Sequence, residues 1–223
     1  MSRIGTGVIA LVFFTSMFLT SCGQHVTVTP PVSTSLGYGV FQAMGEIHRY
    51  PVHLGLFITP KLQNETIRVS RELGTAEIPF GQIVGAKIIQ ILSYKFDRLT
   101  FVKDKDSGPP LIFTVDLEGE NPSVGVDIDQ HPIFLTGGAT FDVVAKVDAR
   151  LRITLTENGQ QIWMGHARVV KEMSSGGAAY GIAEGSSQAS DLTNRVTDEL
   201  MVDFVTQMQR SSALKNFFEE KKK

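Results

Sequence analysis

The sequence predicts an α+β fold in a single domain: an antiparallel β-sheet with two α-helices packed on one of its faces. Apolar and polar residues alternate along 141–155, and the turn dipeptide Asn158-Gly159 follows closely, which is typical of a long β-hairpin. Apolar residues recur at helical spacing after Pro79 and again after Ser190. Antiparallel strands with helices gathered on one face belong to the α+β class.

Residues 1–21 have the features of a secretory signal peptide. One basic residue, Arg3, precedes an apolar stretch, and Leu19-Thr20-Ser21 then leads to Cys22. A membrane-spanning helix is the alternative, but a span needs about 20 predominantly apolar residues, and polar residues interrupt this shorter run. The Leu19–Cys22 pattern resembles the lipobox of bacterial lipoproteins. That resemblance implies that Cys22 is lipidated and that the mature chain begins there.

Composition limits the classes of function. The chain has 21 basic and 23 acidic residues, and this near balance argues against nucleic-acid binding, which needs a strongly basic face. Cys22 has no second cysteine to pair with, so we expect core packing alone to stabilise the domain. Gly23 follows it where an Asp would resemble the retention signal for the inner membrane. By that analogy we expect a lipid-anchored protein on the periplasmic face of the outer membrane.

The chain then divides into a tether, a domain and a tail. Residues 22–35 are rich in Thr, Pro, Ser and Val and predict a flexible tether. The α+β domain is expected over 36–218, before a charged tail of 219–223. The start of the domain is ambiguous: Tyr38, Val40 and Phe41 fit a short strand, whereas Gly37, Gly39 and Gly45 weaken it.

The first half of the domain predicts several strands and one helix. Strands are expected over 52–58, 66–71, 99–102, 111–117 and 124–128. An apolar stripe of helical period predicts a helix over about 79–96. Gly81 and Gly85 weaken that helix by about 1 kcal/mol each, and we expect them to let it lie close against the sheet.

The register of the long hairpin follows from which face its residues share. A two-residue turn would place Arg168 opposite Ala149, on the apolar face of the strand. A three-residue loop over 157–159, with Gly159 left-handed, instead places Asp148 opposite Arg168 and Val147 opposite Val169. We therefore expect the three-residue loop.

The remaining segment predicts a loop and a closing helix. Residues 174–185 are rich in small residues and predict a flexible loop, whose Gly176–Gly181 part does not match a phosphate-binding P-loop. The closing helix is expected to begin near Ser187 or Ser190 and to continue through Phe217 and Phe218.

Several short matches resemble the YajG-like bacterial lipoproteins, a family that is uncharacterised. They are residues 56–60, 145–149, the 157–159 turn, and the closing helix from 200–208 to Phe217-Phe218. The resemblance covers most of the mature chain and implies no catalytic residues. The layout of two helices on an antiparallel sheet also resembles the lipoprotein partner of the outer-membrane lipopolysaccharide translocon.

The sequence offers weak candidates for metal chemistry. Asp127, Asp129 and His131 alternate along one expected strand, so their side chains could converge on a metal. The alternative is a solvated strand face beside a turn, since Pro132 follows directly. Residues 104–108 resemble the start of a calcium loop, but the later acidic ligands are missing, and an ordinary turn is the preferred interpretation.

No catalytic signature is present, and no Gly-x-Ser-x-Gly elbow exposes a serine. We therefore expect a non-enzymatic envelope lipoprotein, without a cofactor, whose domain binds a protein partner or itself. The alternative is an accessory protein that handles lipopolysaccharide or another amphiphile in an apolar groove with a basic rim that includes Arg150 and Arg152. Aromatic residues expected either in the core or at a partner contact are Trp163, Tyr180, Phe217 and Phe218.

Overall fold

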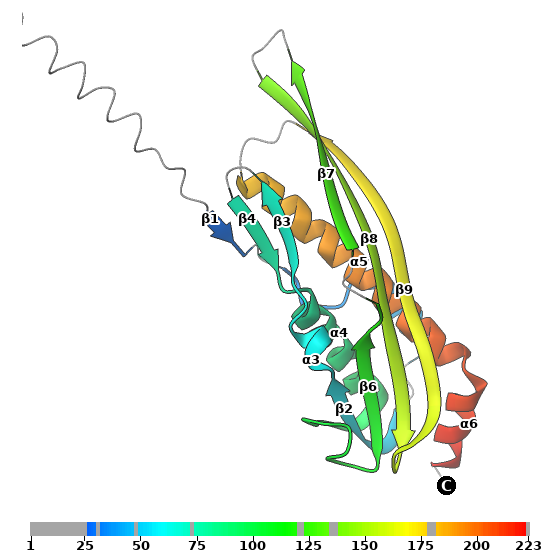
Figure 1. Ribbon diagram of the computed structural model, residues 1–223. Coiled ribbons are helices and arrows are strands. Elements are labelled where there is room, and N and C mark those ends of the chain that lie inside the picture. Colours follow the sequence, from blue (N-terminus) through cyan, green and yellow to red (C-terminus); the bar gives the residue numbers. More distant parts are fainter. Residues whose placement is uncertain are drawn as a thin grey trace, which may run out of the picture.

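The computed structural model describes residues 26–29, 32–46, 49–71, 74–119, 123–133, 138–177 and 182–221 (Figure 1). The expected signal peptide, the lipobox and Cys22 lie outside these residues. Side chains are not described in several strand segments and at the start of the last long helix, chiefly 69–76, 123–147 and 171–189. Among the described residues, no helix is long and apolar enough to cross a membrane.

A six-stranded sheet forms the body of the molecule. Its strands are β2 (Tyr50–Ile58), β5 (Phe96–Phe101), β6 (Leu111–Leu117), β7 (Ser123–Ile133), β8 (Gly138–Glu157) and β9 (Gln160–Gly177). They run in the order β5-β2-β6-β8-β7, and β9 pairs with the other edge of β8. The α+β prediction is confirmed, but the sheet is mixed because β2 pairs in parallel with both β5 and β6. Alternation within a strand fixes which face is buried and carries no information on the direction of its neighbours.

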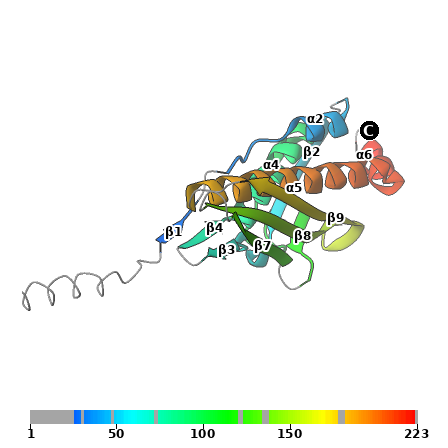
Figure 2. The same ribbon diagram turned by 90° about the horizontal axis from the view of Figure 1, so that it is seen from above.

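Helices cover one face of this sheet, as the sequence predicts (Figure 2). The two long ones are α4 (Phe80–Lys95) and α5 (Ile182–Arg210), and α6 (Ser212–Glu220) follows α5 directly. Apolar side chains of α4, α5 and the inner sheet face form one core, which includes Ile88, Phe113 and Phe204, each 0% exposed. β9 is an edge strand, and α5 covers it: Asp203 Oδ2 accepts the backbone N–H of Arg168 at 2.8 Å.

The segment left ambiguous by the sequence is helical, and two expectations about loop and helix boundaries are wrong. Tyr38–Met44 forms the short helix α2 rather than a strand. β9 continues to Gly177, so residues 174–177 belong to a strand and not to the expected loop. α5 begins at Ile182, several residues before the serines expected to cap it. The rest of the expected loop, residues 178–181, lies outside the described residues.

A second, three-stranded sheet has the order β1-β4-β3. Its strands are β1 (Val26–Val28), β3 (Ile67–Arg71) and β4 (Gly74–Ile78), and the short helix α3 (Pro60–Gln63) precedes β3. β3 was expected, whereas β1 falls inside the expected 22–35 tether and pairs in parallel with β4. Ser33 also donates its backbone N–H to Asn194 Oδ1 of α5 at 3.1 Å. Parts of the expected tether therefore lie against the fold.

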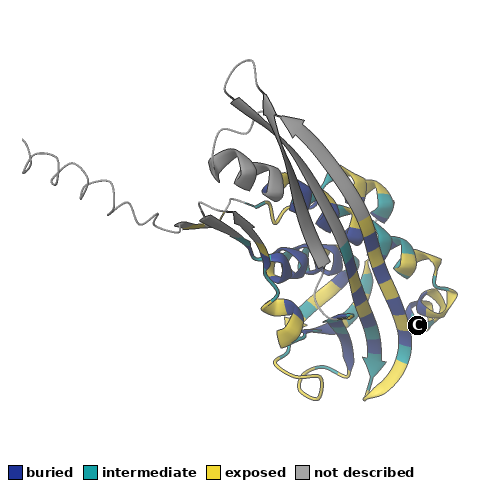
Figure 3. Ribbon diagram, turned by 45° about the horizontal axis from the view of Figure 1, so that its top comes forward, coloured by how far each residue is buried: buried dark blue, intermediate teal, exposed yellow. Residues whose placement is uncertain are grey.

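The β8–β9 hairpin keeps the expected faces but not the expected register. Its turn has two residues, since Glu157 pairs with Gln160, and both Asn158 (φ 50°) and Gly159 (φ 79°) are left-handed. An irregularity between Leu155 and Thr156 then shifts the pairing by one residue. A bulge thereby returns the apolar residues of both strands to the core, and buried and more exposed residues alternate along 148–155 and 163–170 (Figure 3).

The two glycines of α4 approach different neighbours. A Cβ added at Gly85 would lie 3.2 Å from Ile58 Cδ1 on β2, which confirms the expected approach to the sheet. A Cβ added at Gly81 would lie 1.6 Å from the carbonyl oxygen of Leu62. Gly81 therefore packs against the backbone of α3 rather than against the sheet.

Candidate functional site

A cavity of about 470 Å³ opens where α2, α4, α5 and α6 meet the start of β2. Its volume lies within the range of roughly 300–1,000 Å³ that is usual for small-molecule sites. Its apolar lining consists of Met44, Tyr50, Met208, Leu214 and Phe218. α6 and the C-terminal end of the described chain lie at one end of the molecule (Figures 1 and 2). The lining residues from α6 place the cavity at that end.

A break between α5 and α6 shapes one wall. Ser211 has extended backbone angles, and its Oγ accepts the backbone N–H of Leu214 at 3.2 Å, which starts α6 as an N-cap. α6 therefore turns back, and its i and i+4 residues Leu214 and Phe218 face the core. Phe218 stacks on Tyr50 of β2 with ring centroids 4.6 Å apart. The wall is consequently apolar and aromatic.

The end of α2 forms the opposite wall. Gly45 ends the helix with φ 56°, which leaves the carbonyl oxygen of Met44 free for two side chains. Lys95 Nζ of α4 donates to it at 3.3 Å, and Gln209 Nε2 of α5 donates at 2.9 Å. One carbonyl therefore ties three helices together at the cavity.

Three cations belong to the lining: Lys95, Arg210 and Lys215. Within the part of the chain that the structure describes, none of them forms an ion pair with a carboxylate. Burial lowers the pKa of the Lys95 ammonium from its ordinary value. The cavity thus joins an apolar interior to positive charge, a combination that suits a ligand with a hydrocarbon part and an anionic part.

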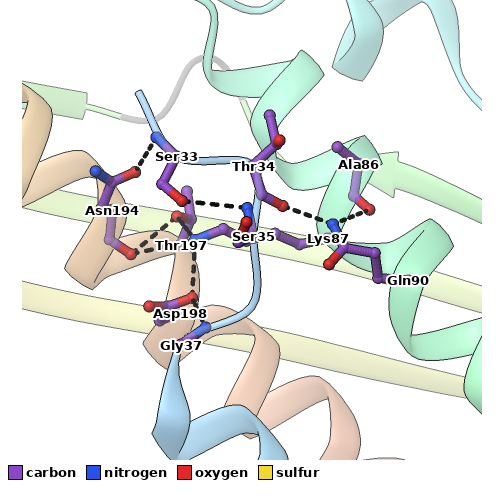
Figure 4. A network of polar contacts seen from close by, with 10 residues as sticks. All are labelled: Ser33, Thr34, Ser35, Gly37, Ala86, Lys87, Gln90, Asn194, Thr197 and Asp198. Carbon is purple, nitrogen blue, oxygen red and sulfur yellow. Dashed lines mark hydrogen bonds and ion pairs between the residues drawn. The ribbon is translucent and has the colours of Figure 1, made fainter. Parts of the chain in front are cut away.

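A network of polar contacts fixes the segment before α2 to α4 and α5 (Figure 4). Asp198 Oδ1 of α5 accepts both the Lys87 ammonium at 2.8 Å and the backbone N–H of Gly37, the N-cap of α2, at 3.1 Å. Lys87 also donates to Thr197 Oγ1 at 2.8 Å. Gln90 Nε2 of α4 bonds the carbonyl oxygen of Thr34 at 2.7 Å. The segment that leads into α2 is therefore fixed to both long helices.

The expected metal ligands lie on β7. The backbone of Asp127, Asp129 and His131 pairs with Val144, Asp142 and Thr140 of β8, so the expected strand is confirmed. Their side chains are outside the described residues, and metal binding stays a prediction. Among the side chains that are described, no group of three could hold a metal ion.

The prediction that Arg150 and Arg152 form the basic rim of an apolar groove is wrong. Both alternate with buried residues of β8 and face away from the helices. Arg150 pairs with Asp148 at 3.1 Å, and Arg152 pairs with Asp116 at 2.7 Å. The open sheet face is thus a ladder of compensated charges, and the positive charge at the cavity comes from α4, α5 and α6 instead.

The remaining candidates from the sequence lie in the core or in an ordinary turn, where the structure describes them. Trp163 packs edge-on against Phe113 with centroids 6.1 Å apart, and Phe218 is 2% exposed, so both belong to the core. Tyr180 lies outside the described residues. Asp104 Oδ1 accepts the backbone N–H of Asp106 at 3.0 Å, as in an ordinary turn.

Sequence reasoning did not find the cavity. Its lining comes from five elements, and no fixed spacing connects Met44 with Lys95 or with Met208. The one sequence feature that points to the cavity is the strongly amphipathic segment 212–220. We interpreted it only as a continuation of the closing helix.

No protein-family model matches the chain, and neither does any curated protein sequence. Among solved structures, the chain is similar to a Xanthomonas campestris protein described under family DUF330, with 8% identity, a TM-score of 0.48, and coverage of 89% of this chain and 99% of that one. A neuraminyllactose-binding hemagglutinin homolog from Helicobacter pylori is 14% identical, with a TM-score of 0.48 and coverage of 79% and 95%. An uncharacterised lipoprotein B from Nitrosomonas europaea is 12% identical, with a TM-score of 0.33 and coverage of 77% and 93%.

Two of the similar structures, this one from Nitrosomonas europaea and one from Acinetobacter baumannii, are described as lipoproteins. The finer resemblances expected from the sequence, to YajG-like lipoproteins and to the lipoprotein partner of the lipopolysaccharide translocon, stay predictions.

Proposed function

We propose that this protein is a lipid-anchored envelope lipoprotein whose non-enzymatic domain binds an amphiphile in the cavity between α2 and α6. One observation carries the proposal: an apolar cavity of about 470 Å³ whose lining includes three cations without carboxylate partners among the described residues. Convergent polar groups on an apolar concave surface are the usual composition of a ligand site. This favours the amphiphile-handling alternative over the partner-binding function that the sequence placed first.

The anchor part of the proposal rests on the Leu19–Cys22 pattern. Lipidation of Cys22 would hold the domain at the membrane, and Gly23 favours the periplasmic face of the outer membrane. A Cys22→Ser variant is expected to leave the membrane fraction while its domain still folds. Retention of that variant in washed membranes would show that something other than Cys22 anchors the chain.

The binding part is tested with the unacylated mature chain, residues 22–223 carrying Cys22→Ser. A fluorescent fatty acid should bind it saturably. Met208→Trp places a larger side chain in the cavity and should weaken that binding at least tenfold. Met164→Trp is the matched control, since Met164 is 46% exposed on β9 and does not line the cavity.

If both tryptophan variants bind the probe like the parent chain, the cavity is not the site. Absence of saturable binding to the parent chain would remove the amphiphile function altogether.

A second candidate function, binding of a protein partner or self-association, is favoured by a cluster of exposed aromatic residues. Tyr38 is 77% exposed on α2, and Phe41 packs edge-on against Tyr94 of α4 with centroids 5.9 Å apart. Exposed aromatic groups are enriched where partners bind. Crosslinking in the native envelope should capture a defined partner through Tyr38, and a Tyr38→Ser variant should reduce that product.

A further inference from the structure

The charges at the cavity differ from those on the open sheet face. On the open sheet face, Arg150, Arg152 and Arg168 each bond a carboxylate within 3.1 Å. At the cavity, Lys95, Arg210 and Lys215 have no such partner among the described residues. On the open sheet face these three arginines are therefore compensated, whereas the cavity brings three cations without carboxylate partners among the described residues to one concave site.

Lys95 is the most enclosed of the three. It is partly buried, while Arg210 and Lys215 are exposed. It is the last residue of α4, and its ammonium contacts one carbonyl oxygen, that of Met44, at 3.3 Å. An ammonium has three donors, so further donors remain for a ligand. Partial desolvation also strengthens the attraction between this cation and an incoming anion.

The size of the cavity restricts the apolar part of the ligand. About 470 Å³ lies in the lower half of the usual range for ligand sites. One hydrocarbon chain fits this volume better than the several chains of a lipopolysaccharide molecule. Met208, which is partly exposed, lines it, and a flexible thioether side chain adapts to ligand chains of varied shape.

We infer that the cavity takes a single-chain amphiphile with an anionic head group, either a carboxylate or a phosphate, and that Lys95 binds that head group with Arg210 and Lys215 at the mouth. The inference rests on the proposed function and names its ligand class. Glu46 is the one carboxylate among the described lining residues, and it is exposed. One carboxylate against three cations leaves the lining with a net positive charge.

The test compares ligands that share one chain and differ in the head group. Dodecanoate, dodecyl phosphate, dodecyl maltoside and dodecyltrimethylammonium are titrated into the mature Cys22→Ser chain below their micelle concentrations. The two anions should bind at least tenfold more tightly than the neutral maltoside, and the cation should bind most weakly. Added salt should weaken the binding of the two anions and of no other ligand, because it screens their attraction to the cations.

Substitutions then assign the head-group contact. Lys95→Gln should reduce the affinity for both anions about tenfold and leave the affinity for the maltoside unchanged. Lys95→Arg keeps the positive charge and should restore the affinity for the anions. Lys105→Gln, in an exposed turn, is the matched control. If the melting curve shows that Lys95→Gln does not fold, Lys215→Gln replaces it, because the Lys215 side chain is exposed. That variant should weaken binding of the anions at least threefold.

Equal affinity for all four head groups, or no effect of either substitution on the anions, would overturn the inference and leave the proposed amphiphile function standing. If none of the four ligands binds the parent chain, the inference and the proposed function fall together.

Discussion

The Lys87 ammonium lies 2.8 Å from Asp198 Oδ1, and the same oxygen accepts the backbone N–H of Gly37. Lys87 is 0% exposed, and this carboxylate is the acidic group that pairs with it. The contact joins α4, α5 and the start of α2, and α2 supplies Met44 to the cavity (Figure 4). An ion pair between a buried lysine and a partly exposed aspartate therefore positions one wall of the proposed site.

Asp198→Ala should lower the free energy of unfolding by about 3–5 kcal/mol, because it leaves the Lys87 charge buried without its partner. The double variant Lys87→Met/Asp198→Ala should recover much of that loss, since no buried charge remains. Urea denaturation followed by circular dichroism measures both. Asp191→Ala, an exposed position on the same helix, should change stability by less than about 0.5 kcal/mol. Equal stability of Asp198→Ala and the parent would contradict this role.

Gly81→Ala should destabilise the protein by about 1–3 kcal/mol, because the new methyl group meets the backbone of α3 and one helix must move. Gly39→Ala is the control on α2. A Cβ there has only Val202 Cγ2 within 4 Å, at 3.8 Å, which is ordinary contact. Its effect should stay within about 1 kcal/mol and favour the helix. Thermal denaturation of the two variants separates the effect of the close contact between α4 and α3 from the general effect of alanine on helix stability.

The stability of the hairpin should depend on acid pH through Asp148. Hydrogen bonds from Arg150 and Arg168 lower the pKa of that carboxyl from 3.8 to about 2. A carboxylate with a depressed folded-state pKa stabilises the fold above its unfolded pKa, and the contribution is lost as pH falls toward the folded value. Asp148→Asn should therefore be less stable than the parent at pH 7, and the difference should shrink between about pH 4 and pH 2. A difference that stays constant over this window would show that the carboxylate charge does not contribute.

The hairpin turn should tolerate change poorly at one position. Gly159 has φ 79°, and a side chain in this left-handed region costs about 1–2 kcal/mol. Gly159→Ala should lower the free energy of unfolding by that amount. Gln160→Ala, on the neighbouring exposed residue, should be nearly neutral. Chemical denaturation measures the free energy of unfolding of both variants. Equal losses in the two would indicate that a side chain at Gly159 does not strain the turn.

The hairpin also shows how far the sequence predicts the fold. Its faces were predictable, because alternation along β8 and β9 allows only shifts of two residues. Its register was not, because a bulge between Leu155 and Thr156 compensates for the two-residue turn. Asp148 was expected directly opposite Arg168. Val170 stands there instead, and Arg168 reaches Asp148 diagonally at 3.1 Å.

Long-range pairing accounts for the other differences. β1 and α2 are short segments with weak local signals, and their structure depends on partners far along the chain: Gly74 for β1 and Asp198 for α2. The cavity has the same character, since Met44, Lys95 and Leu214 come together only when four helices have packed. Local periodicity predicts elements and their buried faces, and it cannot predict which distant side chains remain uncovered at their ends.

The central claim is that an anionic single-chain amphiphile occupies the cavity between α2 and α6. The most direct measurement is photo-crosslinking of the mature Cys22→Ser chain by dodecanoate that carries a diazirine at the end of its chain, with the labelled residues located by mass spectrometry. We expect saturable labelling at Met44, Met208 or Leu214, which unlabelled dodecanoate displaces and Met208→Trp suppresses. Labelling confined to the open sheet face around Met164, or labelling that unlabelled dodecanoate does not displace, would contradict the claim.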